Sequence, residues 1–419
     1  MAETSVSLRT LNAVSWLAIV IYILWFTTSF QIRHHSLEPD RLLDYALNYN
    51  QSRLVAAELS YPSRSQGFLY PPANVVLRLA LGRLGLQSSA VVWMVLLIGA
   101  TLLCVESSLY LLGLSKHPVR YFMALLALSS VEYFFEWDLK YLNGNVLYLA
   151  CLLTALILIQ KTQVQGAASL LAFSLVLKLY SAVFLPYFFL KKQYRLCFAT
   201  GLWLVLFFLA LPIGYFGVGN AWTVTEHWVR SLLDSGDSTF PLEFPAYLTG
   251  LHKTLLILLT STGGNGRYNI ADLSYETVWA VTRTFQSVWV AAVMMYFIRA
   301  RHCSANVPLG TRQMIDAGVL SLLVLPLSPV VQPHHGVVMF IPAMVLIRVL
   351  FDASVAPAFR TSAGAILSAC YVELQFGPRI QLRGIGMMTC VMILMSGLIL
   401  AFGALSRLPA DARGKEAVS

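Results

Sequence analysis

The sequence carries little charge for its length. Only 12% of its 419 residues are charged, whereas 58% are hydrophobic and the mean hydropathy is +0.69. A soluble domain carries roughly 25% charged residues, and no polar stretch here is long enough to form a separate soluble core. The composition therefore excludes an ordinary soluble protein and predicts one membrane domain over residues 1–419.

Cysteines with metal-type or redox-type spacing are also missing. The six cysteines lie in or beside apolar segments or in one predicted cytoplasmic loop, and none forms a CxxC pair. We therefore expect no disulfide framework, no metal site and no cofactor, with a requirement for a divalent ion left open. The net charge of +9 is scattered over short connections, which is typical of topology signals, so nucleic-acid binding is not expected.

What the sequence has instead is a series of apolar segments. Each is about long enough to cross a membrane, and together they predict an all-α polytopic protein with about 11–13 transmembrane or re-entrant helices. Segment 166–190 is interrupted by Lys178, and we expect it to form two half-helices that dip in and return. The first segment lacks a small-residue cleavage site and is expected to be retained. The other segments are 13–30, 89–113, 121–137, 145–160, 196–216, 276–299, 313–328, 336–351, 361–376 and 384–405.

Lysine and arginine counts in the short connections predict the orientation. Both termini are then cytoplasmic, and loops 31–88 and 217–275 face outward. These loops exceed the usual connection length. We expect helices at 40–58 and 73–86 in the first loop and at 248–259 in the second. The segment 73–86 places its apolar residues against Arg78 and Arg83, and such a basic amphipathic helix can lie in the membrane interface.

The first outward loop holds the carboxylates best suited to catalysis. A carboxylate outside the membrane and beside an apolar wall can act as a general base on a hydroxyl group. Asp40 and Asp44 are four residues apart, so a helix would place them on one face. The structural alternative is that Asp40, which follows Pro39, caps a helix. Tyr70 precedes two prolines that either start a helix or shape a ligand contact.

Two adjacent histidines form a second candidate site. His334 and His335 lie at the outer end of a predicted span. Adjacent imidazoles cannot share one helical face, so one is free to face a cavity while the other caps or packs. An imidazole there would donate to a phosphate oxygen or orient a carboxylate. A polar pair at the lipid–water boundary is the structural alternative.

Charged residues near other spans complete the candidates. Lys178 lies inside an apolar segment, where an ionisable side chain is costly and functional by default, and it would bind a phosphate as a point charge. Glu132 and Glu136 share a helix face. They either bind an acceptor or pair with Lys140, and pairing is favoured.

Several motifs occur in an order that resembles glycosyltransferase family 87. This family comprises polyprenyl-phosphate-mannose-dependent mannosyltransferases of the C-type glycosyltransferase superfamily. The resemblance covers residues 13–351, with an acid after the first span. Departures from the family pattern fall at Asn145, Ser181 and Gln332. The motifs are FLYPP at 68–72, NGNVL at 143–147, LKLY at 177–180 and LSPVVQPHH at 327–335.

The resemblance implies a C-type glycosyltransferase fold and an inverting reaction. The acid after the first span would deprotonate an acceptor hydroxyl, which then attacks the anomeric carbon of a lipid-phosphate sugar. By order, Asp40 matches this base best, Asp44 stays the alternative, and His335 is assigned to catalysis beside it. The donor phosphate and its lipid are expected to contact Lys178, His334, Tyr70 and Arg64, and the acceptor Glu132 and Asn145.

The predicted function is therefore transfer of a sugar, expected to be mannose, from a polyprenyl-phosphate donor to a glycolipid or glycan acceptor. The enzyme would act on the outer face of a bacterial plasma membrane, with membrane lipids as further partners. A transporter or flippase of lipid-linked sugars predicts internal repeats, and none is seen. A membrane glycan ligase or polymerase is the other alternative, which Arg230 and Arg267 in loop 217–275 keep open.

Overall fold

The computed structural model confirms an all-α polytopic membrane protein. It describes residues 2–33, 43–61, 70–233, 250–261, 270–303, 307–328, 331–376 and 383–406, and no strand occurs in these ranges. Five described helical segments are long and apolar enough to cross a membrane, namely Ser7–Thr28, Leu86–Leu111, Tyr194–Phe216, Tyr275–Ile298 and Pro333–Phe351. A sixth span is added if α6 (Glu132–Lys140) and α7 (Asn145–Gln160), which meet at a 116° bend, are counted together as one.

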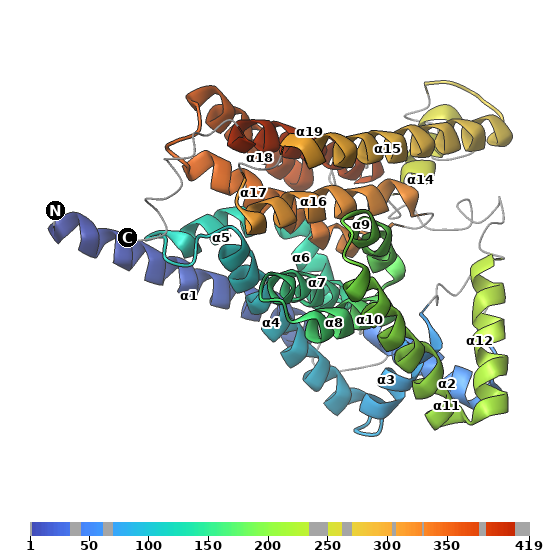
Figure 1. The fold of residues 1–419 in the computed structure, drawn as a ribbon. Helices are drawn as coiled ribbons and strands as arrows, with labels where there is room; N and C mark the ends of the chain where they lie inside the picture. The colour runs from blue at the N-terminus through green and yellow to red at the C-terminus, as the bar shows by residue number, and fades with distance from the viewer. Residues whose placement is uncertain are drawn as a thin grey trace. The chain divides into compact units, whose positions relative to one another are not determined.

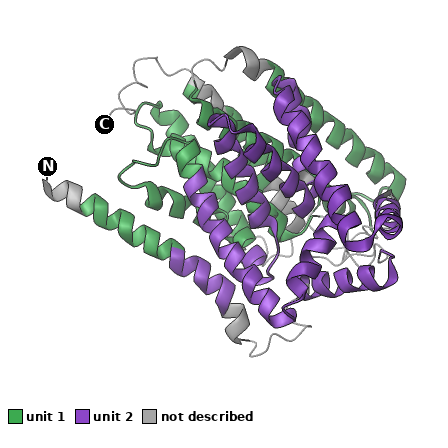
Figure 2. Ribbon diagram, turned by 60° about the horizontal axis from the view of Figure 1, so that its bottom comes forward, with its two compact units in different colours: residues 1–19, 108–135, 245–419 green, residues 20–107, 136–244 purple. Residues whose placement is uncertain are grey.

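The helices, which Figure 1 labels, belong to two compact units, which Figure 2 shows in different colours. Unit 1 comprises residues 1–19, 108–135 and 245–419, and unit 2 comprises residues 20–107 and 136–244. Three helices contribute residues to both units, namely α1 (Ala2–Arg33), α4 (Leu86–Leu111) and α6. The other helices of unit 1 are α5 (Arg120–Ser130), α14 (Leu251–Leu259), α15 (Tyr275–Cys303), α16 (Leu309–Leu327), η6 (Pro333–Met339), α17 (Phe340–Phe351), α18 (Pro357–Phe376) and α19 (Arg383–Ser406).

Unit 2 places short helices against longer ones. Helix α8 packs against both α7 and α10, while α3 packs against α2, α11 and α12. Its remaining elements are α2 (Leu43–Glu58), α3 (Pro72–Gly82), α8 (Val164–Leu177), η2 (Leu179–Val183), α9 (Phe184–Leu190), α10 (Tyr194–Val205), η3 (Leu206–Ala210), α11 (Leu211–Phe216) and α12 (Val218–Leu233).

A small apolar core fixes the helices of the first predicted loop. Val55 of α2, Val75 of α3 and Val224 of α12 are fully buried together, and Tyr70 packs against them. Burial of a valine side chain stabilises a fold by roughly 1.5–3 kcal/mol. Helix α3 begins with Pro72 in its first turn, because proline has the right φ and needs no hydrogen-bond acceptor there. The Tyr-Pro-Pro stretch is therefore a helix start.

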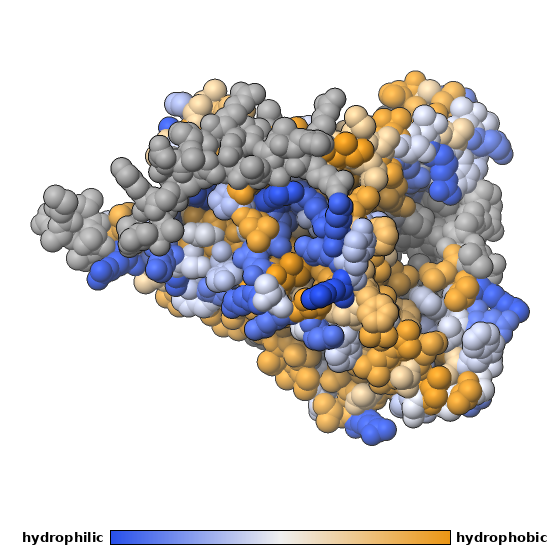
Figure 3. All heavy atoms as spheres, viewed as in Figure 1, coloured by the Kyte–Doolittle hydropathy of each residue, from blue (hydrophilic) through white to orange (hydrophobic). Residues whose placement is uncertain are grey.

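Apolar side chains are exposed on helices that are long and apolar enough to cross a membrane. They include Val95 and Leu103 on α4, and Phe198, Leu202 and Val205 on α10. Figure 3 shows hydrophobic atoms gathered over the part of the surface that these helices form. Single exposed apolar residues are ordinary in soluble proteins, but rows of them on helices of spanning length indicate a lipid-facing surface.

Two predicted segments are broken in the structure, one of them against expectation. The span predicted at 121–137 is wrong, because α5 ends at Ser130, α6 begins at Glu132, and Val131 between them leaves the helical conformation. The segment 166–190 breaks at Lys178, as expected, and the backbone there is extended. Nδ2 of Asn74 donates to the carbonyl oxygen of Val176 at 3.1 Å. This bond competes for a carbonyl that a continuing helix would use.

The second predicted loop contains more helix than its sequence indicated. Helix α14 (Leu251–Leu259) matches the segment predicted at 248–259, but α12 (Val218–Leu233) was not expected. Helix α12 mixes apolar and polar residues on opposite faces instead of forming a continuous apolar run. Such a helix is stable only once its apolar face packs, as Val224 does here.

Candidate functional site

Asp44 lies in the first turn of α2, and an amide from the bend between α6 and α7 holds its carboxylate. Nδ2 of Asn143 donates a hydrogen bond to Oδ2 of Asp44 at 2.9 Å. Burial raises the pKa of Asp44 above its ordinary value, although the Asn143 hydrogen bond and the charges of Lys178 and Arg78 oppose this shift. A carboxylate with a raised pKa is a better general base near neutral pH.

A chain of hydrogen bonds supports Asn143 from the buried side. Oδ1 of Asp138 accepts from the backbone N of Asn145 at 3.2 Å and from its Nδ2 at 2.8 Å, while Oδ2 accepts from the backbone N of Val146 at 2.9 Å. Nδ2 of Asn145 also donates to Oδ1 of Asn143 at 2.9 Å. Asp138 therefore caps the start of α7, and the chain leads from Asp138 through two amides to Asp44.

A tryptophan packs on the glycine of this bend. A Cβ atom on Gly144 would lie 3.2 Å from Cζ2 of Trp93, so a larger residue would press on the indole ring. Nε1 of Trp93 donates to the carbonyl oxygen of Leu142 at 2.9 Å. The Asn-Gly-Asn sequence thus combines a polar network on one side with a close aromatic contact on the other.

Lys178 points from the break after α8 to Tyr70. Its Nζ donates to the phenolic oxygen of Tyr70 at 3.1 Å and lies 4.9 Å from the ring centroid. Both side chains are half-buried, and the charge of Lys178 acts on the Asp44 carboxylate. The structure therefore brings together three residues that the sequence singled out separately.

Arg78 also belongs to this cluster, although its sequence pattern predicted an exposed position. The segment 73–86 was expected to present Arg78 on a polar face, but the side chain is only 4% exposed. Its guanidinium carbon lies 5.1 Å from the ring centroid of Tyr70, 5.2 Å from that of Trp93 and 5.9 Å from that of Tyr45. The three rings come from separate elements, so no local pattern in the sequence indicated this cage.

The two histidines lie in unit 1 and have different surroundings within η6. Nδ1 of His335 accepts a hydrogen bond from the backbone N of Gln332 at 3.1 Å, and the Gln332 side chain accepts from the backbone N of His335. His335 is thus the capping member of the pair, and in its neutral form it carries its proton on Nε2. The rings of His334 and His335 lie 4.6 Å apart at 84°, and both are buried.

The other residues predicted for the site lie on α6, at the start of α7 or outside the described residues. Glu136 pairs with Lys140 at 3.5 Å, as favoured, and Glu132 opens α6. Nδ2 of Asn145 donates both of its hydrogens within the bend. The predicted contact of Asn145 with an acceptor could therefore be made only by its buried Oδ1. Asp40 and Arg64 lie outside the described residues.

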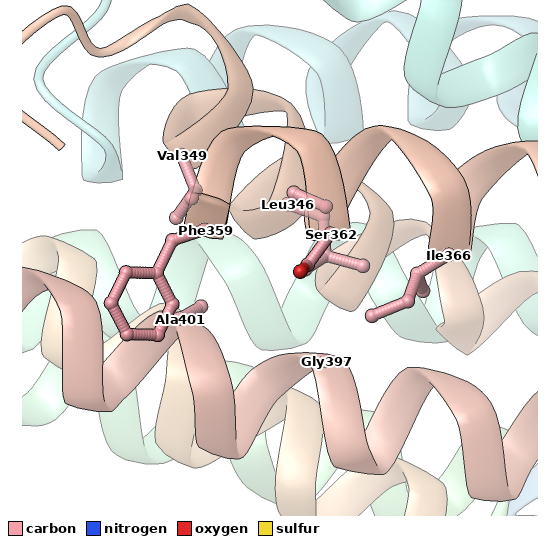
Figure 4. A pocket seen from close by; sticks show the side chains of 8 residues that line it. Leu346, Val349, Phe359, Ser362, Ile366, Gly397 and Ala401 are labelled. Atoms are coloured by element: carbon pink, nitrogen blue, oxygen red, sulfur yellow. The ribbon is translucent and has the colours of Figure 1, made fainter. Parts of the chain in front are cut away.

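Neither a pocket in unit 1 nor a cluster of metal ligands competes with this site in the described ranges. A pocket among α17, α18 and α19 is lined by apolar groups and Ser362 (Figure 4). Its volume of about 10 Å³ is at the lower limit for one water molecule, so it does not hold a sugar. Within the described ranges, no three histidine, cysteine or acidic side chains gather as metal ligands would.

The fold and the residues just described define a polytopic membrane protein with a polar, partly buried site. Comparison with family models makes this definition specific, because the model of glycosyltransferase family 87 matches residues 68–326. The chain belongs to this family and is a membrane glycosyltransferase, which confirms the resemblance. Comparisons with curated proteins and with solved structures gave no match. The matched range includes Arg78, Asn143 and Lys178 but neither Asp44 nor the histidine pair.

Proposed function

We propose that the protein moves a sugar, with mannose as the expected one, from a polyprenyl-phosphate donor to a hydroxyl group of a glycolipid or glycan. The carboxylate of Asp44, held by Asn143 and influenced by two positive charges, carries the proposal. A transfer of this kind needs a base for the hydroxyl and positive charge for the leaving phosphate. Asp44 and Lys178 offer these two functions within unit 2.

In the proposed step, Asp44 takes the proton of the acceptor hydroxyl as the hydroxyl oxygen attacks the anomeric carbon. The new carbon–oxygen bond forms while the bond from this carbon to the donor phosphate oxygen breaks. The leaving polyprenyl phosphate keeps the electron pair, and attack from the opposite side inverts the anomeric configuration. Lys178 stabilises the charge on the leaving phosphate as a point charge.

Asp44 becomes the preferred base, whereas order along the chain favoured Asp40. The preference rests on the hydrogen bond from Asn143 and on the upward direction of the Asp44 pKa. His335 is proposed to assist catalysis, His334, Tyr70 and Arg64 to bind the donor, and Glu132 and Asn145 to bind the acceptor. The distribution of lysine and arginine supports a site on the outer face of a bacterial plasma membrane, with both termini cytoplasmic.

Transfer assays with purified protein test the proposal. Polyprenyl-phosphate mannose and nucleotide sugars are supplied separately, and the glycosylated product is measured. We expect product only with the lipid donor. Asp44→Asn should lower the rate about 10²- to 10⁴-fold, the usual contribution of a general base, with an unchanged unfolding temperature.

The matched control is Asp40→Asn, four residues earlier. Loss of transfer in Asp40→Asn with full activity in Asp44→Asn would return the assignment to Asp40. Product from a nucleotide sugar alone would contradict the lipid donor, and transport of a lipid-linked sugar without a covalent change would indicate a flippase.

A further inference from the structure

The Arg78 guanidinium is buried, and among the described residues it forms no ion pair, although the charge of Asp44 acts on it. Three aromatic rings surround it, and their negative faces compensate part of the cost of burying a cation. Nε donates to Oδ1 of Asn74 at 2.8 Å, but Nη1 has no hydrogen-bond partner. A buried charged donor that is left unsatisfied is costly, so its presence requires an explanation.

Asn74 fixes the direction in which Arg78 presents this nitrogen. Its Oδ1 accepts from Nε of Arg78, while its Nδ2 donates to the carbonyl oxygen of Val176. Asn74 therefore links the arginine to the end of α8, immediately before Lys178. With Nε fixed, the planar guanidinium has little freedom to turn Nη1 elsewhere.

Access to Arg78 leads past Tyr70. Tyr45 and Trp93 are almost completely buried, whereas Tyr70 is half-buried. Tyr70 is also the ring that Lys178 contacts through its phenolic oxygen. A ligand that reaches Lys178 and moves the Tyr70 ring aside would therefore meet Arg78 next.

We infer that Arg78 binds the phosphate of the lipid-linked donor together with Lys178, with Nη1 supplying a hydrogen bond to a phosphate oxygen. This inference rests on the proposed lipid-phosphate donor. A guanidinium presents its N–H groups in a fixed plane that suits phosphate oxygens, which a lysine cannot reproduce. Lys178 supplies a mobile charge at the entrance, and Arg78 supplies a directed donor behind it.

Arg78→Lys separates this role from a structural one, because lysine keeps the charge and the contact with the rings but loses the planar fork. We expect the donor KM to rise about 10- to 100-fold, the effect of losing a hydrogen bond to a charged group, while the acceptor KM is unchanged. Arg83→Lys is the matched control, since Arg83 follows the same helix and is exposed, and it should behave as the unaltered protein. A fall in kcat and stability without a selective change in donor KM would overturn the inference.

Binding in nanodiscs distinguishes this inference from the proposed function. Polyprenyl phosphate and polyprenol, which lacks the phosphate, are compared for their effect on the unfolding temperature. The unaltered protein should be stabilised by the phosphate lipid alone, and Arg78→Lys much less. Equal stabilisation of both proteins would overturn the role of Arg78 only, whereas no stabilisation of the unaltered protein would overturn the lipid donor as well.

A structure of the unaltered protein with polyprenyl phosphate provides a test that does not depend on a folded variant. A phosphate oxygen is expected within hydrogen-bonding distance of Nη1 of Arg78. A phosphate bound out of reach of this nitrogen would contradict the inference.

Discussion

Removal of the Asn143 amide should change the pH dependence of sugar transfer. Nδ2 of Asn143 donates to Oδ2 of Asp44 at 2.9 Å and stabilises the ionised carboxylate. Asn143→Ala removes this donor, so the pKa of Asp44 should rise further above its ordinary value. Because Asp44, as the proposed base, must be ionised to accept a proton, the activity lost on acidification should be lost at a higher pH than in the unaltered protein.

The size of the shift follows from the energy of the bond. A hydrogen bond to a charged group contributes about 1.5–3 kcal/mol, and 1.36 kcal/mol corresponds to one pKa unit. Asp44 is partly exposed, so water would replace some of the lost interaction and the lower end applies. We expect the acid limb of the kcat/KM profile to move upward by about one unit.

Asn143→Asp makes the same test without disturbing the bend. An aspartate keeps the oxygen that accepts from the backbone N of Gly144 and from Nδ2 of Asn145. It replaces the donor by an oxygen that faces the Asp44 carboxylate. Two carboxylates at this distance share a proton, so the shift should exceed that of Asn143→Ala.

The assay is a kcat/KM profile for sugar transfer measured between acidic and alkaline pH. The variants should lose activity mainly at low pH and approach the unaltered protein as the pH rises. Glu136→Gln is the control, because it removes a nearby ion pair with Lys140 that does not involve Asp44. An acid limb that stays in place in both Asn143 variants would refute the coupling of Asn143 to the base.

Replacement by alanine should lower stability to different extents at two glycines. In Gly144→Ala the new Cβ would lie 3.2 Å from the Trp93 ring, so a small movement suffices and stability should fall by no more than about 1 kcal/mol. In Gly336→Ala it would lie 2.4 Å from the Phe134 ring, and the overpacking should cost about 1–3 kcal/mol and lower activity through the neighbouring His335. Thermal unfolding in detergent compares the two variants, and an equal effect at both positions would contradict the packing argument.

Apolar length predicted the membrane helices well because it reports directly on the solvent around a helix. Segments 145–160 and 196–216 lie within helical stretches of the structure with only small differences at their ends. The predicted span 121–137 failed because length alone does not show where a helix breaks. The cap that Asp138 provides for α7 likewise joins residues seven and eight positions apart across a bend, which apolar length does not report.

Arg78 could not be placed from its sequence because an arginine on an amphipathic helix normally faces water. Its burial depends on rings from Tyr45, Tyr70 and Trp93, which are far apart in the chain. Lys178 was easier to identify, since an isolated charge in an apolar run is unusual by itself. A buried charge can thus be detected from the sequence when its neighbours are all apolar. When it lies on an amphipathic helix, its burial is recognised only from the tertiary structure.

The orientation of Asn143 explains why a capped bend and a carboxylate occur together. Oδ1 of Asn143 accepts from the backbone N of Gly144 and from Nδ2 of Asn145. Reversal of the amide would lose both bonds and turn an oxygen toward Asp44. The network therefore fixes the donor on the side of Asp44, and Asp138 fixes Asn145 in turn. Two neutral amides also separate the carboxylates of Asp138 and Asp44 along this chain, so that one stabilises the bend while the other lies at its partly exposed end.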